Sequence, residues 1–309
     1  MSDAPTDWTI GRLIEWTRTF FEKKDIPQPR LEAEILLAHV LGLERIDLYM
    51  KYEQPVEEGP RSEFRELVRR RAEGEPTRYL TGGCEFMSLA MKVTPDVLIP
   101  RPETEMLVEE VLRRAGAKRS PPPAAPPPEP AAATLTAIDR CTGCGCVAVS
   151  LAVHLPGCRV TATDVSAAAL AVARTNAEAH AVADRVALLE GDLYDALDAA
   201  DAQPADFLLS NPPYVAQGEW EGLQREIRDH EPRGALVAGP TGLEIVGRIV
   251  KGAPAYLRGG ATLLVEIGSG QGAAAKEMAQ AVRGLADVEI LRDYAGLDRI
   301  LLARREPVG

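Results

Sequence analysis

The sequence predicts an α/β protein in which a doubly wound parallel sheet follows a small all-α domain. Strand and helix patterns alternate from residue 135 to the end of the chain, and this alternation implies crossover connections between parallel strands. The preceding N-terminal stretch shows apolar side chains at helical spacing instead. With 309 residues, the chain has room for one large domain and one small partner.

The N-terminal domain is expected to be a small helical unit over residues 1–78. Apolar residues recur at helical spacing in residues 10–21 and again in residues 31–38. A third helix is expected over residues 60–68, where Pro60 suits the first helical turn.

Residues 79–100 predict a β-hairpin linker. Gly82 and Gly83 suit a turn, and apolar residues alternate as in a strand over residues 87–93. A second apolar run covers residues 97–99 and ends at a proline.

The third domain is expected over residues 101–309. It starts with a helix at residues 103–115 and a Pro- and Ala-rich insertion at residues 120–133, whose composition favours an extended surface spacer. The other expected elements are strands at 135–139, 160–164, 186–190, 207–210 and 262–267, a closing pair near 288–291 and 299–303, and helices at 146–155 and 166–181. A doubly wound sheet of this kind binds its ligand at the carboxyl ends of the strands.

The composition is that of a globular protein and argues against contact with nucleic acid or membranes. Hydrophobic residues make up 46% and charged residues 26%, which is typical of a globular protein. The net charge of -11 argues against a nucleic-acid partner gripped through its phosphates. No apolar run is long enough for a membrane helix, and the start lacks a secretory signal, so we expect a cytoplasmic protein without membrane contact.

The five cysteines do not suggest a disulfide scaffold. Cys141, Cys144 and Cys146 are spaced like part of a metal site, but no fourth soft ligand lies close in the sequence. We therefore expect no metal.

A glycine-rich loop follows the first expected strand of the sheet. Asp139 ends that strand, and Thr142-Gly143-Cys144-Gly145 leads into a helix, so the backbone can approach a ligand closely. Asp164 ends the second strand, where a carboxylate can accept hydrogen bonds from both ribose hydroxyls. The two features together indicate an adenosine-type cofactor. NAD and a tight turn without any ligand remain alternatives for the loop alone.

Two further segments follow expected strands. Asp192 and Leu193 come after the third strand and would lie near an adenine ring, although Asp192 also suits a helix cap. Asn211-Pro212-Pro213-Tyr214 comes after the fourth strand. The paired prolines remove two N–H donors and fix the backbone, so this tetrapeptide forms a rigid, acceptor-rich pocket suited to an NH₂ group.

The Asn-Pro-Pro-Tyr tetrapeptide resembles the signature of methyltransferases that act on amino or amide nitrogens. More specifically, the chain resembles the release factor glutamine N5-methyltransferase family of the PrmC or HemK type over almost its whole length. The resemblance rests on residues 76–82, on Val97-Leu98-Ile99-Pro100-Arg101-Pro102-Glu103-Thr104-Glu105, and on residues 229–232 and 235–237. It implies a class I S-adenosylmethionine-dependent, Rossmann-like fold with an antiparallel last strand.

The resemblance also implies a set of site residues. The expected cofactor-binding residues are Asp139, Cys141, Thr142, Gly143, Cys144, Gly145, Asp164, Asp192, Leu193 and Asn211. The expected substrate-binding residues are Arg101, Glu103, Asn211, Pro212, Pro213 and Tyr214, of which Asn211, Pro212 and Tyr214 are expected to be catalytic. Arg140 and Cys141 depart from the family pattern, which has Leu and Gly in their places.

The expected reaction is methyl transfer to the side-chain amide of a glutamine, most simply in the Gly-Gly-Gln loop of a peptide chain release factor. Asn211 and the carbonyl of Pro212 would accept the two amide N–H bonds, and Tyr214 would stack on the amide. The helical domain would dock the protein substrate. Alternatives are a glutamine of a ribosomal protein, an adenine N6 or cytosine N4 of nucleic acid, an NAD-linked dehydrogenase, and a binding module without activity.

Overall fold

The computed structural model describes residues 8–117 and 135–307, which form two compact units. One unit comprises the chain up to Gly82 together with Gln224–His230, and the other comprises Gly83–Leu223 and the chain from Glu231 onward. The Pro- and Ala-rich insertion expected at residues 120–133 lies outside the described residues.

The helical unit packs its helices around an apolar core. Its elements are α1 (Ile10–Glu22), α2 (Pro29–Leu41), α3 (Arg45–Met50), α4 (Glu58–Ala72), α5 (Thr77–Thr81) and α10 (Arg225–His230). Phe21, Leu36 and Leu37 are fully buried in this core, as the helical spacing of apolar residues requires. The helices α3 and α5 were not predicted, because five or six residues are too few to show a helical period.

The segment that contains α10 is joined to the helical unit by a buried cation. Arg71 lies near the end of α4 and is 6% exposed. Its guanidinium pairs with Glu32 of α2 and with Glu226 of α10, at 2.8 Å in both cases. Two carboxylates therefore satisfy the charge that is removed from water.

The second unit begins with the β-hairpin of β1 (Gly83–Phe86) and β2 (Leu89–Lys92). The predicted strand over residues 87–93 is wrong at its start, because Met87 and Ser88 form the turn with φ of 51° and 62°. Met87 is fully buried, so its place in the alternating pattern reflects burial of a turn residue and not extended backbone. Residues 97–99 are not a strand either.

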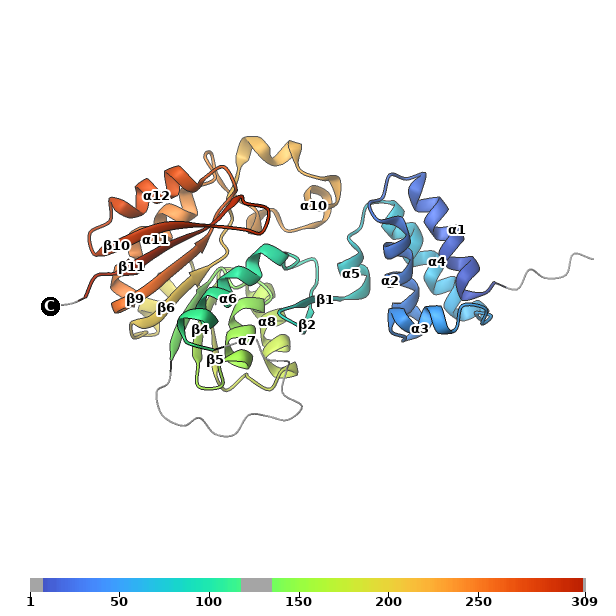
Figure 1. Ribbon diagram of the computed structural model, residues 1–309, viewed down its shortest axis with the longest axis horizontal. Coiled ribbons are helices and arrows are strands. Elements are labelled where there is room, and N and C mark those ends of the chain that lie inside the picture. Colours follow the sequence, from blue (N-terminus) through green and yellow to red (C-terminus); the bar gives the residue numbers. More distant parts are fainter. Residues whose placement is uncertain (1–7, 118–134, 308–309) are drawn as a thin grey trace, which may run out of the picture. The chain divides into compact units, whose positions relative to one another are not determined.

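The predicted doubly wound sheet is confirmed, with seven strands in the order β10-β11-β9-β6-β3-β4-β5 (Figure 1). Its parallel strands are β3 (Thr136–Arg140), β4 (Arg159–Asp164), β5 (Val186–Glu190), β6 (Ala205–Ser210) and β9 (Leu257–Glu266). The strand β11 (Asp298–Arg305) runs antiparallel to both β9 and β10 (Leu285–Arg292). The strand order reverses between β3 and β6, which is where such sheets form a ligand crevice.

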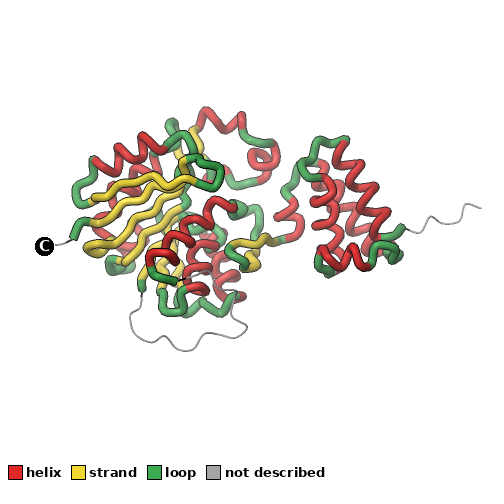
Figure 2. The backbone as a smooth tube through the Cα atoms, in the orientation of Figure 1, coloured by secondary structure: helices red, strands yellow, loops and turns green. Residues whose placement is uncertain are grey.

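Helices cover both faces of this sheet (Figure 2). One layer contains α6 (Glu105–Arg114), α7 (Cys146–His154) and α8 (Ala167–Ala179), and the other contains α11 (Glu244–Tyr256) and α12 (Gly272–Gln280). The short elements of the unit are α9 (Asp195–Ala199), β7 (Val215–Ala216), β8 (Val237–Gly239), and the 3₁₀ helices η1 (Pro102–Thr104), η2 (Gln217–Gly222) and η3 (Arg233–Ala235). No helix among the described residues is both long and apolar enough to span a membrane.

Candidate functional site

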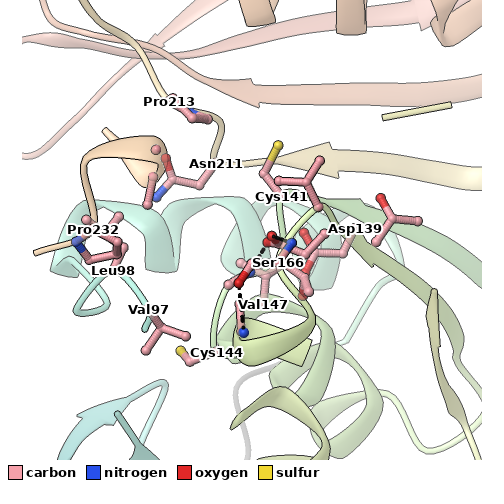
Figure 3. Close-up of a pocket in the computed structure, with 18 of the residues that line it drawn as sticks. Val97, Leu98, Asp139, Cys141, Cys144, Val147, Ser166, Asn211, Pro213 and Pro232 are labelled. Atoms are coloured by element: carbon pink, nitrogen blue, oxygen red, sulfur yellow. Dashed lines mark hydrogen bonds between the residues drawn. The ribbon is translucent and has the colours of Figure 1, made fainter. Parts of the chain in front are cut away.

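A cavity of about 390 Å³ lies at the carboxyl ends of β3, β4 and β6 (Figure 3). Its volume is in the range of small-molecule sites. The loop after β3 lines one part of it, and Asn211 and Pro213, which follow β6, line another. Val97, Leu98 and Pro232 add apolar walls.

The loop after β3 is held by two carboxylates. Asp139 is buried, and its Oδ2 accepts a hydrogen bond from the Thr142 hydroxyl at 2.6 Å. The backbone N–H of Gly143 donates to Asp164 Oδ2 at 2.9 Å. Burial raises the pKa of Asp139 to about 7, because its charged form loses contact with water.

Gly145 is the last residue of this loop and precedes α7 with φ of 79°. A Cβ atom at this position would come within 2.9 Å of the Ala173 Cβ on α8. Gly145 does not line the cavity, so its small size serves the packing of α7 against α8.

Asp164 ends β4 and lines the cavity. Its Oδ2 accepts the Gly143 N–H, and its Oδ1 accepts the Ser166 N–H at 3.0 Å. Each carboxylate oxygen has a second acceptor site, so the side chain can still receive hydrogen bonds from a pair of ligand hydroxyls. Burial raises the pKa of Asp164.

Asp192 and Leu193 also line the cavity. Leu193 is buried and offers an apolar surface, as a flat heteroaromatic ring would require. Asp192 forms an ion pair with Arg248 at 2.8 Å, and both side chains are about half exposed, so this pair adds little stability.

The amide of Asn211 has one satisfied end and one unsatisfied end. Its Nδ2 donates to the Thr104 hydroxyl oxygen at 3.0 Å. Its Oδ1 is buried and has no hydrogen-bond partner among the described residues. A buried acceptor without a partner is costly in a folded protein, so this oxygen is suited to a ligand N–H.

The Thr104 hydroxyl connects Asn211 to a buried carboxyl group. It donates to Glu266 Oε2 at 2.7 Å, and the Tyr214 hydroxyl donates to Glu266 Oε1 at 3.2 Å. Glu266 is the last residue of β9 and is fully buried. Burial raises the pKa of Glu266 to about 7.

The structure brings most of the predicted site residues to one cavity. Ten line it: Asp139, Cys141, Thr142, Gly143, Cys144, Asp164, Asp192, Leu193, Asn211 and Pro213. Five do not: Arg101, Glu103, Gly145, Pro212 and Tyr214. Arg101 pairs with the buried Glu231 at 2.5 Å, and Glu231 also accepts the Ile99 N–H at 3.2 Å, so the pair braces the segment that carries Val97 and Leu98.

Sequence reasoning missed Glu266 as a member of the site. The signal was present, because an acidic residue interrupts the apolar run Leu263-Leu264-Val265-Glu266-Ile267 at the end of a central strand. A charged residue at such a position is rarely buried without a specific partner.

Of the three cysteines in and after the loop, Cys144 and Cys146 are buried and Cys141 is partly buried. Burial raises the pKa of Cys141 to about 12, which keeps the thiol protonated. Within residues 8–117 and 135–307, no group of three or more His, Cys, Asp or Glu side chains is placed to hold a metal ion.

Comparison with solved structures agrees with the fold. The catalytic domain of hMettl16, solved in complex with MAT2A 3'UTR hairpin 6, superposes with a TM-score of 0.53 and 18% sequence identity. The match covers 79% of this chain and 83% of that chain. This likeness shows that the fold is a methyltransferase fold.

Comparison with protein families is more specific. The model of the PrmC N-terminal domain matches residues 12–82, and the methyltransferase small domain matches residues 129–229. The release factor glutamine methyltransferase of Rhodopirellula baltica is 42% identical over 96% of this chain and 96% of its own length. That of Geobacter sulfurreducens is 40% identical over 98% and 99%. The chain therefore belongs to the release factor glutamine methyltransferase family.

Proposed function

We propose that this protein transfers the methyl group of S-adenosylmethionine to the side-chain amide nitrogen of a glutamine in a peptide chain release factor. Its family membership supports the reaction and the class of substrate. The observation that carries the proposal is the Asn211 side chain, which lines the cavity and whose buried Oδ1 has no hydrogen-bond partner among the described residues. A primary amide supplies the N–H that this oxygen lacks.

The cavity fits S-adenosylmethionine by the chemistry of its lining. Asp164 would accept the ribose hydroxyls, Leu193 would contact the adenine, and Asp139 with the loop Thr142–Cys144 would hold the amino-acid part. When bound, the cofactor supplies an electrophilic methyl group on a sulfonium.

Positioning of the amide provides most of the catalytic effect. An amide nitrogen is a weak nucleophile, because its lone pair is delocalised into the carbonyl. Asn211 Oδ1 would accept one of its N–H bonds and aim the nitrogen along one direction, and well-aligned partners recover ~7–11 kcal/mol of barrier. Positive charge grows on nitrogen during transfer, so this acceptor binds more strongly in the transition state.

The cavity walls favour the same chemistry. Val97, Leu98 and Pro232 are apolar, and they reduce the water around the reacting amide. A drier site strengthens each hydrogen bond to the developing charge.

The decisive experiment uses radiolabelled S-adenosylmethionine and a purified release factor that carries a Gly-Gly-Gln loop. We expect label in the wild-type factor and none after that glutamine is changed to alanine. Label retained in the altered factor would contradict the proposal. A parallel reaction with ribosomal protein and nucleic acid serves as the control, and preferential labelling of either would also contradict it.

A cytoplasmic location is part of this proposal. The five cysteines are all free, which agrees with a reducing compartment. The release factor is a protein partner, and the net charge of -11 gives no support to direct binding of nucleic acid.

A further inference from the structure

The orientation of the Asn211 amide decides whether the cavity presents an acceptor or a donor. With Nδ2 on Thr104, the oxygen Oδ1 remains for the ligand. With the amide turned over, the NH₂ group would face the ligand instead. A substrate NH₂ group needs an acceptor, so only the first orientation binds it productively.

Thr104 by itself does not select between these two orientations. A hydroxyl has one hydrogen and two lone pairs, and it can either donate to an amide oxygen or accept from an amide N–H. The selection therefore depends on where the single Thr104 hydrogen points.

Glu266 determines where that hydrogen points. Both of its oxygens accept hydrogen bonds, Oε2 from the Thr104 hydroxyl at 2.7 Å and Oε1 from the Tyr214 hydroxyl at 3.2 Å. Because an ionised carboxylate has no hydrogen to give, the Thr104 hydrogen must point toward it. The Thr104 lone pairs then face Asn211, where an amide oxygen would be repelled and an amide N–H is bound.

We infer that Glu266 is a positioning residue for methyl transfer, acting through the Thr104 hydroxyl to keep the Asn211 Oδ1 directed at the substrate amide. The inference deepens the proposed function and rests on it for the identity of the substrate. The chain of contacts itself runs from Glu266 through Thr104 to Asn211 in the structure.

Protonation of Glu266 removes the preference for one orientation of the Asn211 amide. A neutral carboxyl group can donate its hydrogen to the Thr104 oxygen, which frees the Thr104 hydrogen to bond the oxygen of a turned Asn211 amide. The NH₂ group of Asn211 would then face the cavity and repel the substrate N–H.

Several charged or titratable groups face Glu266. Arg299 on β11 contributes a positive charge that favours the carboxylate, and Arg299 itself pairs with Asp293 at 3.1 Å. Glu103 on η1 contributes a negative charge that opposes it. The Tyr214 hydroxyl also faces Glu266, and burial raises the pKa of this hydroxyl, so it stays a hydrogen-bond donor.

The rate of methyl transfer should therefore fall as the pH falls through the range where Glu266 takes up a proton. Burial raises the pKa of Glu266 to about 7, so the protonated form predominates below that pH. The protonated form does not hold the Asn211 amide in one orientation. Asp139 has its pKa raised to about 7 as well, so a variant is needed to assign the inflection.

The test measures single-turnover methyl transfer to the release factor between about pH 6 and about pH 9 in the wild type and in Glu266→Gln. Glutamine keeps the shape but does not ionise, so we expect a loss on the order of 10²-fold at the upper pH and no inflection. The affinity for S-adenosylmethionine, measured by calorimetry, should stay within about threefold of the wild type, because Glu266 is not a cavity-lining residue. An inflection that persists in Glu266→Gln with an unchanged maximal rate would overturn the inference.

Two substitutions of Thr104 separate positioning from folding. Thr104→Val removes the hydroxyl at constant shape and should reproduce the loss, whereas Thr104→Ser restores the hydroxyl and should recover most of the rate. Thr17→Val is the matched control for stability, because Thr17 is also buried and its hydroxyl has no hydrogen-bond partner among the described residues. Equal rates in Thr104→Val and Thr104→Ser would contradict the inference.

A readout without substrate distinguishes this inference from the proposed function. In isotope-labelled protein, the Glu266 carboxyl carbon and the Asn211 side-chain nitrogen should titrate with a common midpoint. Thr104→Val should abolish the midpoint at Asn211 and retain it at Glu266. Separate midpoints in the wild type would overturn the relay even if release factors are methylated, and a common midpoint would support it even if the substrate proves to be another amide.

Discussion

At the scale of single residues, Asn211 is central to the proposed function. Its Nδ2 is fixed on Thr104, and its Oδ1 is buried and available to a ligand. The sequence predicted Asn211 from the Asn-Pro-Pro-Tyr tetrapeptide, but it did not predict Glu266, because a contact between β9 and η1 joins residues that are far apart in the chain.

Asn211→Ala should lower the single-turnover rate by about 10²–10³-fold, the usual loss when one preorganised hydrogen-bonding group is removed from a transition state. Binding of S-adenosylmethionine should change little, since Asp164, the proposed acceptor for the ribose hydroxyls, is untouched. Quench-flow transfer of label and calorimetry measure the two quantities. A wild-type rate in this variant would show that Asn211 does not hold the amide.

Burial of the Arg140 side chain is costly. It is fully buried at the end of β3, and its three guanidinium nitrogens have no hydrogen-bond partner among the described residues. The guanidinium carbon lies 4.0 Å from the centre of the Tyr194 ring, which stacks on Tyr256 at 4.7 Å. Burial lowers the pKa of Arg140, and the cation–π contact offsets only part of that cost.

Arg140→Met should therefore stabilise the protein, by about 1–4 kcal/mol if the thioether fills the space beside the Tyr194 ring. Chemical denaturation of both proteins measures this difference in the free energy of unfolding. A clear loss of stability would mean that the stacked tyrosines compensate the buried charge in full.

At the scale of elements, the close approach of α7 and α8 depends on Gly145. A Cβ atom there would lie 2.9 Å from the Ala173 Cβ, and the φ of 79° is unfavourable for any other residue. The tight strand-to-helix turn predicted from the sequence is thus also a packing contact between two helices.

Gly145→Ala should destabilise the second unit by about 2–4 kcal/mol, from the backbone strain and the forced separation of the two helices. Gly116→Ala is a matched control, because Gly116 has φ of 68° but a Cβ added there would meet no atom within 4 Å. Thermal unfolding should show a much larger shift for Gly145→Ala than for the control. Equal shifts would mean that only the backbone conformation matters.

Helices and strands were predicted well from the sequence where the apolar pattern was long. They were predicted poorly where tertiary contacts determine the backbone conformation. The parallel strands β3, β4 and β5 lie close to their expected ranges. The helices α11 and α12 were not assigned, although they form one of the layers on the sheet. The hairpin turn was misplaced because Met87 is held by tertiary bonds: its N–H donates to Glu105 and its carbonyl contacts the His154 ring.

At the scale of the whole molecule, the chain contributes to the helical unit twice. Residues 224–230 belong to that unit, although the segments on both sides of them belong to the other one. Sequence patterns do not indicate that residues 224–230 belong to the helical unit, because α10 has only six residues and no buried face. Arg71 pairs with a carboxylate in each of the two contributions, Glu32 and Glu226.

Arg71→Ala should leave Glu32 and Glu226 without their shared cation and lower the stability of the helical unit by about 3–5 kcal/mol. Hydrogen exchange should accelerate most in Arg225–His230, because α10 loses its ion pair with α4. Arg69→Ala is the control, since Arg69 is exposed and its ion pairs, among the described residues, are with Glu66 of its own helix and Glu73 at the helix cap. Similar hydrogen-exchange rates of α10 in the two variants would argue against a stabilising role of the Arg71 ion pairs.

The return of the chain to the helical unit also bears on synthesis. A ribosome that has released residue 82 has released the five N-terminal helices of the helical unit but not its last one. Arg71 then has Glu32 as its counter-ion but lacks Glu226 until most of the sheet has emerged. A truncated gene that stops after residue 82 would consequently encode a helical unit that lacks α10.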